Sequence, residues 1–360
     1  MDGLPDRCGA LKGVETSSES DDYLPSVALV ISTYNEASVI RSKLTNAKTL
    51  DYPRSKLEIY VLSDACTDDT ESIAREFSNT TVFRSDVRKG KSAVLDQFVP
   101  NINADILVFS DANSLYDSQA IRFLAAPLAD PRIGYVVGQQ RYVDVKDSPA
   151  AEAENVYWTR ESWVKSLESE LGAVVGGDGA ITAIRRSDYV PSLSTDESDF
   201  YVPLKLAIRG LRGVYEPRAF CQENASEQFA GQFFRKIRIV NRSLCSTFRC
   251  LPALNPLRVG LFAYMLWSHK VLRWLMPLHL LIAIICLVGL AIEGNVFFQA
   301  LAILPAVITL LATLYCIPGL RSFRPVYLCF YFCSMSLAVL VGLLSFILGY
   351  RVSTWTPDRT

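Results

Sequence analysis

The sequence predicts a globular α/β domain followed by an α-helical transmembrane bundle, and two observations support this fold class. In the first third of the chain, short β-rich runs alternate with helical patterns. Charge later almost disappears: five of the 92 residues from 259 to 350 are charged, whereas the other 268 residues carry 68 charges. The mean hydropathy of +0.20 is therefore an average over two unlike regions. A wholly soluble protein, a disordered chain and a pure membrane bundle are excluded.

Four runs rich in β-forming residues are predicted as strands: Val27–Ser32, Leu57–Ser63, Thr80–Arg84 and Asp105–Ser110. Helical patterns between them predict three helices: Ala37–Leu50, Asp68–Phe77 and Lys91–Val99. This alternation predicts a parallel sheet covered by helices. About 258 residues precede the apolar region, which is enough for one large domain with its own core.

Carboxylate-bearing turns follow three of these strands: Thr33-Tyr34-Asn35-Glu36, Asp64–Asp69 and Asp111-Ala112-Asn113. Because ligands of open α/β sheets bind at the carboxyl ends of strands, the turns should share one crevice. Asp68 and Thr67 are each better explained as caps of the following helix, but three acidic turns at successive strand ends favour a site. Asp111 and Asn113 alternate, so their oxygens could face one Mg²⁺ or Mn²⁺ that bridges a diphosphate.

Several other kinds of site are not expected. The sequence has neither a GxGxxG motif after a strand nor a P-loop, and the glycines at 176, 177 and 179 are as consistent with a tight turn as with a site. The net charge of −1 argues against nucleic-acid binding. Nine scattered cysteines and two histidines favour neither a zinc site nor a disulfide framework. Residues 1–25 are polar and acidic, without the apolar core of a signal peptide, and are expected to be a disordered N-terminus.

Three charge-free runs predict transmembrane helices between residues 274 and 350: Trp274–Ile292, Gly294–Leu320 and Pro325–Tyr350. The shortest run would be about 28 Å long as a helix, close to the thickness of the hydrocarbon core. The segment 257–273 mixes apolar residues with Arg258, Lys270 and Arg273, which favours an amphipathic helix on the membrane surface over a fourth span. Residues 351–360 form a C-terminal tail.

The distribution of basic residues predicts the orientation in the membrane. Basic residues precede the first span and occupy the second short loop, whereas the first loop holds only Glu293. By the positive-inside rule, the N-terminal domain is cytoplasmic, in a plasma or inner membrane. Three spans would place the C-terminus outside, and a re-entrant segment would reverse this. Lys236, Arg238 and Arg242 are expected at the membrane interface.

The motifs taken as a set resemble the family 2 glycosyltransferases, and in particular the membrane-bound synthases of cellulose, hyaluronan and poly-N-acetylglucosamine. The matching segments are Ser32–Glu36, Ser63-Asp64, Asp111–Asn113, Glu197-Ser198-Asp199 and Gln232–Lys236. The resemblance runs from Ser26 to the last span. It implies a GT-A fold, a cytosolic catalytic domain at residues 26–256, a divalent metal and a nucleotide-sugar donor, most commonly a UDP-sugar.

Residue by residue, the resemblance implies the following roles. The positions for the donor are Thr33, Tyr34, Asn35, Glu36, Asp64, Lys91 and Asp111, and the positions for the metal are Asp111 and Asn113. Asp199 matches the general base, and Gln232 and Arg235 match the first and fourth positions of the QxxRW motif. Gly177, Asp178 and Gly179 fall in the sugar or acceptor pocket.

The sequence also departs from the family pattern. Asn113 replaces the second Asp of the DxD metal motif, which should weaken metal binding, and Lys236 replaces the Trp of QxxRW, which argues against long processive synthesis. A transmembrane helix before the catalytic domain, as in many relatives, is not expected from residues 1–25. Trp355–Arg359 faintly resembles the family's gating segment, with a disordered tail as the alternative.

The expected activity is inverting transfer of a sugar to a glycan or a lipid-linked acceptor at the bilayer, as part of polysaccharide or glycolipid synthesis. Asp199 would take the proton of the acceptor hydroxyl, and the metal and Arg235 would stabilise the departing nucleoside diphosphate. A nucleotidyltransferase and a catalytically weak, nucleotide-binding membrane scaffold are the alternatives. A second copy of the chain or an accessory membrane subunit is left open as a partner.

Overall fold

A computed structural model describes residues 23–143, 149–224 and 229–352. Most of the predicted polar N-terminus and the Trp355–Arg359 segment lie outside the described residues. The strands are β1 Val27–Thr33, β2 Leu57–Ser63, β3 Thr80–Arg84, β4 Ile106–Asp111, β5 Leu115–Tyr116, β6 Ile133–Val143, β7 Thr182–Arg185 and β8 Arg212–Asn224. The helices before the apolar region are α1 Ala37–Lys48, α2 Thr70–Arg75, α3 Lys91–Phe98, α4 Ala120–Ala125, α5 Pro149–Glu170, α6 Ser198–Ile208 and α7 Phe229–Arg249.

The eight strands form one mixed sheet in the order β3-β2-β1-β4-β7-β6-β8-β5. The first four positions are parallel, so the parallel sheet predicted from the sequence is confirmed for this half. Strand β7 runs antiparallel to both of its neighbours, and β6 pairs in parallel with β8. The carboxyl ends of β1, β2, β4, β6 and β8 consequently lie at the same edge of the sheet.

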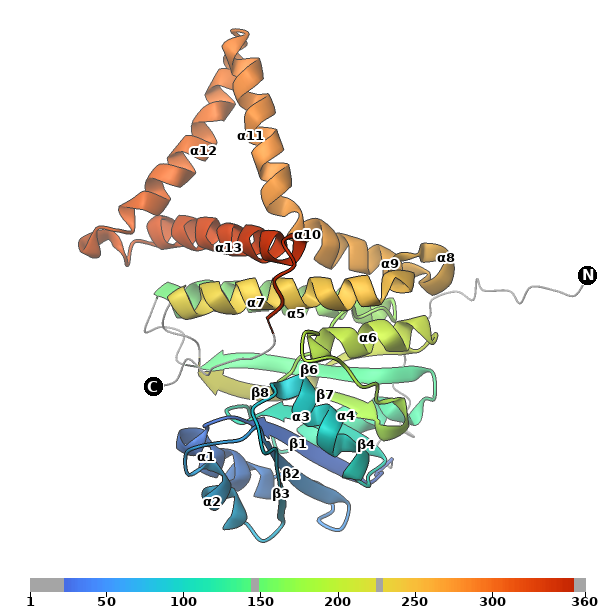
Figure 1. Cartoon of the computed structure of the whole chain (residues 1–360). Helices are drawn as coiled ribbons and strands as arrows, with labels where there is room; N and C mark the ends of the chain where they lie inside the picture. Colours follow the sequence, from blue (N-terminus) through green and yellow to red (C-terminus); the bar gives the residue numbers. More distant parts are fainter. Residues whose placement is uncertain (1–22, 144–148, 225–228, 353–360) are drawn as a thin grey trace, which may run out of the picture.

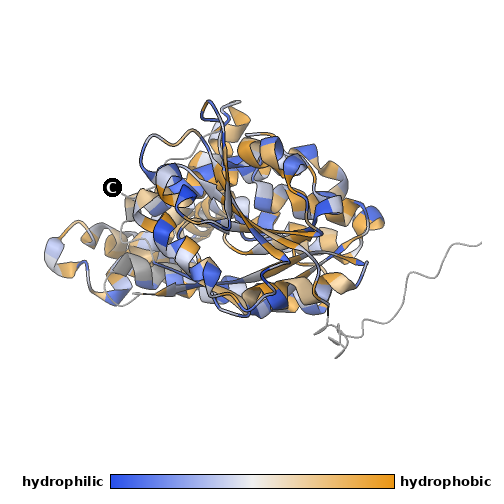
Figure 2. Ribbon diagram, turned by 90° about the horizontal axis from the view of Figure 1, so that it is seen from below, coloured by the Kyte–Doolittle hydropathy of each residue, from blue (hydrophilic) through white to orange (hydrophobic). Residues whose placement is uncertain are grey.

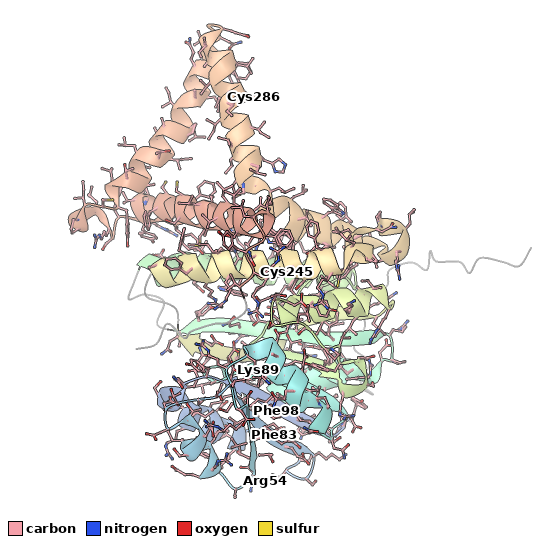
Figure 3. The ribbon with its side chains drawn as sticks, in the orientation of Figure 1. Arg54, Phe83, Lys89, Phe98, Cys245 and Cys286 are labelled. Carbon is pink, nitrogen blue, oxygen red and sulfur yellow. The ribbon has the colours of Figure 1, made fainter. Side chains whose placement is uncertain are left out.

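Hydrophobic residues fill both faces of the sheet. Ile40 and Leu44 of α1 pack on one face, and Val94 and Leu95 of α3 pack on the other. Burial of each such side chain stabilises the fold by about 1.5–3 kcal/mol. Figure 2 shows the strands in the hydrophobic colour and the surrounding helices in both colours, as expected for helices with one face on a core. The short strand β3 is included in this core (Figure 3), since Phe83 stacks on Phe98 with ring centroids 5.1 Å apart.

A third hydrophobic cluster joins the sheet domain, from β1 to α7, to the C-terminal helices. The later helices are α8 Pro256–Val259, α9 Leu261–Met265, α10 Leu272–Trp274, α11 Met276–Ile292, α12 Val296–Leu314 and α13 Arg324–Ile347. Phe200 of α6, Val240 of α7, Trp274 of α10 and Val339 of α13 belong to this cluster. A Cβ on Gly342 of α13 would lie 2.9 Å from the Ile237 carbonyl oxygen of α7, so the glycine allows the two helices to approach closely.

The three long apolar helices of the C-terminal region do not all project from the sheet domain. Helices α12 and α13 are each long and apolar enough to span a membrane, and Leu261–Trp274 with Met276–Ile292 would be a third span bent by 62°. In Figure 1, α11 and α12 project as a hairpin, whereas α13 lies along α7. The predicted amphipathic segment 257–273 forms α8, α9, a π-helical turn and α10 on the domain side of the bend.

Helix α13 is attached to the sheet domain at both of its ends. At its start, Arg324 Nε lies 3.4 Å from Glu152 Oε1 of α5. At its end, Asn241 Nδ2 of α7 donates to the Tyr350 carbonyl at 3.0 Å, and the Val352 N–H donates to Asn241 Oδ1 at 3.4 Å. Asn241 is fully buried, so this end is fixed within the packed structure.

Candidate active site

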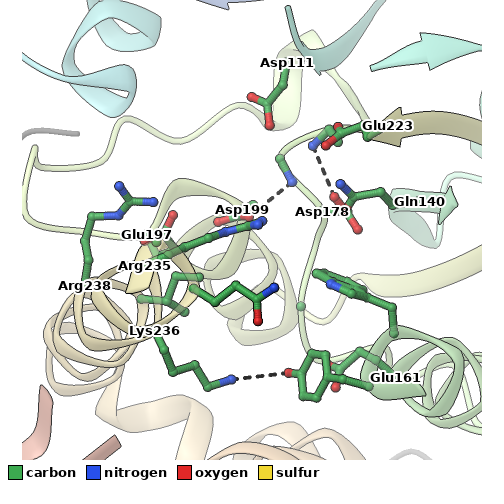
Figure 4. Close-up of a pocket in the computed structure, with 18 of the residues that line it drawn as sticks. Asp111, Gln140, Glu161, Asp178, Glu197, Asp199, Glu223, Arg235, Lys236 and Arg238 are labelled. Atoms are coloured by element: carbon green, nitrogen blue, oxygen red, sulfur yellow. Dashed lines mark hydrogen bonds between the residues drawn. The ribbon is translucent and has the colours of Figure 1, made fainter. Parts of the chain in front are cut away.

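A cavity of about 1550 Å³ opens where the carboxyl edge of the sheet meets helices α5, α6 and α7. All the predicted site residues except Asn35 line it: Thr33, Tyr34, Glu36, Asp64, Lys91, Asp111, Asn113, Gly177, Asp178, Gly179, Asp199, Gln232 and Arg235. Figure 4 shows Asp111 and Glu223 at one end, which we call the sheet end, and Glu161 and Lys236 at the other, which we call the helix end. Asp199 lies between the two ends (Figure 4).

An ion pair between Lys91 and Asp111 occupies the sheet end. Lys91 Nζ lies 2.5 Å from Asp111 Oδ1 and donates to the Gly179 carbonyl at 3.0 Å. Burial acts to lower the pKa of Lys91, but Asp111, together with Asp199 and Glu197, outweighs it and raises this pKa above its usual value. The basic position and the first metal position inferred from the sequence are therefore in direct contact.

The carboxylate of Asp64 holds the turn that delivers Lys91. Its two oxygens accept the N–H groups of Lys89 at 2.7 Å and Gly90 at 2.8 Å. Gly90 has a φ of 89°, which a glycine adopts without steric cost, and α3 begins at the next residue. Asp64 thus positions the basic turn, and its predicted contact with the donor stays a prediction.

The two residues that follow β1 differ in what they face. Asn35 has a left-handed φ of 52°, and its amide exchanges hydrogen bonds with Thr67, donating to Oγ1 at 3.1 Å and accepting the backbone N–H at 2.9 Å. Asn35 therefore joins two loops beside the cavity and does not line it. Tyr34 does line it, and the Arg88 guanidinium lies 3.8 Å from the centre of the Tyr34 ring.

Asn113 is paired with a carboxylate that the sequence reading did not single out. Its Nδ2 donates to Glu223 Oε2 at 3.0 Å, and the Ser114 hydroxyl donates to Oε1 of the same residue. Burial and the nearby Asp111 raise the pKa of Glu223. Glu223 lies beside Asn113 because β8 runs parallel to β6 and ends at the same edge of the sheet as β4. Local sequence patterns do not reveal this pairing.

The arrangement suits a divalent cation that is held jointly by protein and ligand. The described residues contain no group of three or more His, Cys, Asp or Glu side chains able to hold a metal by themselves. Asp111 and Asn113 both line the cavity, and the hydrogen bond to Glu223 uses the nitrogen of Asn113, which leaves the oxygen as the polar atom for a cation. Two such oxygens fit Mg²⁺ or Mn²⁺ when diphosphate oxygens complete the coordination.

Asp199 lies in the first turn of α6 and is held from the glycine-rich turn. The Gly179 N–H donates to its Oδ2 at 3.1 Å, and the Gly177 N–H donates to its carbonyl at 2.7 Å. Its Oδ1 is buried and has no hydrogen-bond partner among the described residues. The N-cap position belongs to Glu197, so Asp199 is not the cap of this helix.

The surroundings of Asp199 make its carboxyl less acidic. Burial and the neighbouring Glu197 raise the pKa of Asp199 to about 6, with a smaller contribution from Asp111, while Lys91 and Arg242 act in the opposite direction. A carboxylate with this pKa is ionised at neutral pH and is a better proton acceptor than an ordinary aspartate.

The expectation that Arg242 lies at the membrane interface is wrong. Arg242 is buried, and its Nε and Nη2 donate to the Asp196 carbonyl and the Ser92 hydroxyl, each at 3.0 Å. Arg249 pairs with the fully buried carboxylate of Asp196. Arg235, Arg242 and Arg249 are spaced by seven residues, so they share one face of α7. This spacing was the available sequence signal that the three arginines share one environment.

The helix end contains a cluster of charged residues that the sequence analysis did not predict. Glu161 of α5 lies 2.8 Å from Lys270 Nζ, 3.0 Å from Arg273 Nη1 and 2.9 Å from His269 Nε2. Burial acts to raise the pKa of Glu161, but the charges of Lys270 and Arg273 and the hydrogen bond with His269 hold it well below its usual value. Lys236 Nζ lies 3.5 Å from the Tyr157 hydroxyl (Figure 4). The residues come from α5, α7 and the segment before α11, so only the tertiary fold brings them together.

Replacing Gly177 by alanine should damage the site although the backbone there is ordinary. The new Cβ would lie 2.6 Å from the Asp199 carbonyl oxygen, so either Asp199 or the glycine-rich turn that contains residue 177 must move. We expect turnover to fall about 100-fold, because a shift of about 1 Å at a reacting group has this effect. Stability should fall by about 1–3 kcal/mol, as for other overpacked sites. Turnover and thermal unfolding measure both. Gly289→Ala is the control, since nothing lies within 4 Å of its Cβ.

Comparison with known proteins identifies relatives of this site. Residues 28–190 match the family described as Glycosyl transferase family 2. The poly-beta-1,6-N-acetyl-D-glucosamine synthase of Staphylococcus aureus (strain COL) is 27% identical over 226 residues, which are 60% of this chain and 54% of that protein. The probable glycosyltransferase YdaM of Bacillus subtilis is 34% identical over 134 residues, which are 35% of this chain and 32% of that protein. The chain thus spans about half the length of the curated relatives it matches, or less.

Two solved structures resemble the whole fold. The mannosyltransferase PcManGT from Pyrobaculum calidifontis, in complex with GDP-Man and Mn²⁺, has a TM-score of 0.68 at 22% identity, covering 91% of this chain and 88% of that one. S. aureus TarS 1–349, in complex with UDP-GlcNAc, has a TM-score of 0.50 at 13% identity, covering 90% and 92%. These likenesses confirm the predicted GT-A fold followed by C-terminal helices.

Proposed function

Because the chain is a family 2 glycosyltransferase, we propose that it transfers a sugar from a nucleoside diphosphate donor to a hydroxyl group of a glycan or lipid-linked acceptor, with inversion at the anomeric carbon. The observation that carries this proposal is the state of Asp199, whose buried Oδ1 has no partner among the described residues while Oδ2 is held by the Gly179 N–H. An oriented carboxylate with a free oxygen in a cavity is what a general base requires.

The residues around Asp199 support a single displacement step. Asp199 accepts the proton of the acceptor hydroxyl as its oxygen attacks the anomeric carbon, and the bond to the diphosphate breaks with oxocarbenium character. Lys91 and Arg235 line the cavity and supply positive charge toward the departing diphosphate. A divalent cation held by Asp111 and Asn113 would neutralise part of that charge when bound.

The donor is proposed to be a nucleotide-sugar bound at the sheet end, next to Thr33, Tyr34, Glu36 and Asp64. Two proteins of similar fold were determined with GDP-Man and with UDP-GlcNAc, and the synthase relative makes a polymer of N-acetylglucosamine. A UDP-sugar is the first candidate, with Mn²⁺ or Mg²⁺ as cofactor. Synthesis of a polysaccharide or glycolipid at the membrane is the corresponding cellular role.

The place of action is proposed to be the cytoplasmic face of a membrane. Residues 26–256 form the catalytic domain, the segment 257–273 lies along the interface, and the apolar region that follows is embedded. The apolar helices and the synthase relative support membrane attachment. The excess of basic residues on the domain side of the first apolar run supports a cytoplasmic catalytic domain.

A donor screen tests the proposal. The full chain in lipid nanodiscs is offered common UDP- and GDP-sugars with Mn²⁺ or Mg²⁺, and release of nucleoside diphosphate is measured together with the mass of any product. We expect release with one class of donor, and its loss when the metal is chelated. Nucleotide binding without turnover would favour a scaffold, and release of sugar 1-phosphate, with transfer of the nucleoside monophosphate, would favour a nucleotidyltransferase. Either result would reject the proposal.

A further inference from the structure

The cavity is larger than a nucleotide-sugar needs. Ligand pockets commonly enclose about 300–1,000 Å³, whereas this one measures about 1550 Å³. The donor residues of the proposed function occupy the sheet end. The helix end lies beyond Asp199 and is walled by α5, α7, α11 and α13. A second ligand therefore has room on the far side of the proposed base, where an acceptor would have to lie.

Among the described residues that line it, the helix end carries more positive than negative charge. Lys236, Lys270 and Arg273 line it, and Glu161 is the carboxylate that faces two of them, at 2.8 Å from Lys270 and 3.0 Å from Arg273. Arg160, the neighbour of Glu161 on α5, is a further cation that lines the cavity. Phosphate groups match such clusters, because lysine and arginine make short, charge-assisted hydrogen bonds to their oxygens.

Apolar side chains continue from this cationic cluster. Met276 at the start of α11 and Leu328, Phe332 and Met335 of α13 line the same cavity, and Phe332 is 43% exposed. These helices belong to the nearly uncharged region of the chain. The cationic wall thus leads directly to an apolar wall that adjoins the membrane region.

From this juxtaposition we infer that the helix end binds the acceptor as an amphiphile, with a phosphate or diphosphate group among Lys236, Lys270 and Arg273 and an apolar chain along α13. The inference rests on the proposed function, since it names the class of acceptor for the same site. A soluble, uncharged glycan would leave the excess of cations without an anion and the aliphatic side chains of Leu328 and Met335 without an apolar partner. A lipid carrier uses both, and holds a hydroxyl of its sugar near Asp199.

Binding of a defined probe tests the inference. The full chain in phosphatidylcholine nanodiscs, with its donor end filled by Mn²⁺ and a nucleoside diphosphate, is titrated with geranylgeranyl diphosphate and followed by native mass spectrometry. Geranylgeraniol and inorganic diphosphate are the matched probes. We expect the diphosphate lipid to bind at least tenfold more tightly than either. Lys236→Gln and Lys270→Gln should each weaken it about tenfold, as expected for one charged hydrogen bond. Arg321→Gln, outside the cavity, is the control and should change nothing.

A steric variant tests the apolar wall independently. Ser336→Trp places a large side chain in the cavity and should abolish lipid binding, whereas Ser334→Trp, on the same helix but outside the cavity wall, should not. Nucleoside diphosphate binding is measured for every variant. If the wild type binds nucleotide but the diphosphate lipid no better than geranylgeraniol, or if a soluble glycan is the acceptor it uses, the inference is wrong and the proposed function stands. If it neither binds nor turns over any donor, the proposed function itself fails.

Discussion

Asp199→Asn is expected to lower turnover about 1,000-fold while leaving nucleotide binding within a few-fold of the wild type. The amide keeps the size of the side chain and can still accept the Gly179 N–H, but it cannot take a proton from the acceptor. Removal of a general base costs about 100- to 10,000-fold in other enzymes. Initial rates of nucleoside diphosphate release and calorimetric nucleotide binding measure the two quantities. Asp69→Asn, at an exposed aspartate without a side-chain cap hydrogen bond, is the control.

The same prediction has a pH signature. The pKa of Asp199 is raised to about 6, and its carboxyl group must be ionised to accept a proton. We therefore expect kcat/KM to be constant above about pH 6. Below it, the ionised fraction and the rate should fall about tenfold per unit of pH. The groups around it are Glu197 and Asp111, which raise this pKa, and Lys91 and Arg242, which lower it. Full activity of Asp199→Asn would exclude Asp199 as the base.

Asn113→Asp is expected to lower kcat/KM about 100-fold, although it recreates the DxD pattern of the family. The new carboxylate would stand about 3 Å from Glu223, where the asparagine amide now donates a hydrogen bond. Two carboxylates at this distance repel each other by about 5 kcal/mol at the effective dielectric of a protein surface. The aspartate would either turn away from the cation or keep a proton. Activity and Mn²⁺ titration of the full chain measure the effect, with the exposed Asn101→Asp as control.

The double variant Asn113→Asp with Glu223→Gln should recover activity to within tenfold of the wild type. The glutamine amide can donate to the new carboxylate, which restores the hydrogen bond with its direction reversed. Such a recovery corresponds to a coupling energy of about 1.5–3 kcal/mol, within the range found for residues in contact. Equal activity of Asn113→Asp alone and of the wild type would show that Glu223 does not determine the residue at position 113.

Local sequence patterns predicted the half of the fold that depends on local pairing. The runs at 27–32, 57–63 and 80–84 became β1, β2 and β3 with boundaries within one residue, because adjacent parallel strands with short crossovers need no distant partner. Strands β6 and β8 were not assigned. They are 11 and 13 residues long and pair with two shifts of register, so their alternation of buried and exposed residues is interrupted.

The residues of the candidate site also fall into those that local sequence patterns predict and those that depend on the tertiary fold. Asp111 and Lys91 follow strand ends or turns, where residue type and position are informative, and they meet in the structure. Glu223 and Glu161 are single carboxylates without a motif, and their importance depends on which strand or helix lies opposite. Arg242 was placed in the membrane interface because its charge was read without its position on the face of α7.

The attachment of α13 at both ends restricts how the chain can be threaded through a bilayer. Arg324 and Tyr350 each contact the domain proposed to be catalytic, so if that domain lies on one side of the membrane, both ends of α13 lie on the same side. If α11 and α12 both cross, their two passages return the chain to the side that it left. Residue 352 then lies beside the catalytic domain, and not across the membrane as three crossings would require. Biogenesis in that case moves only the short turn around Gly294 to the far side, and no charged tail has to be translocated.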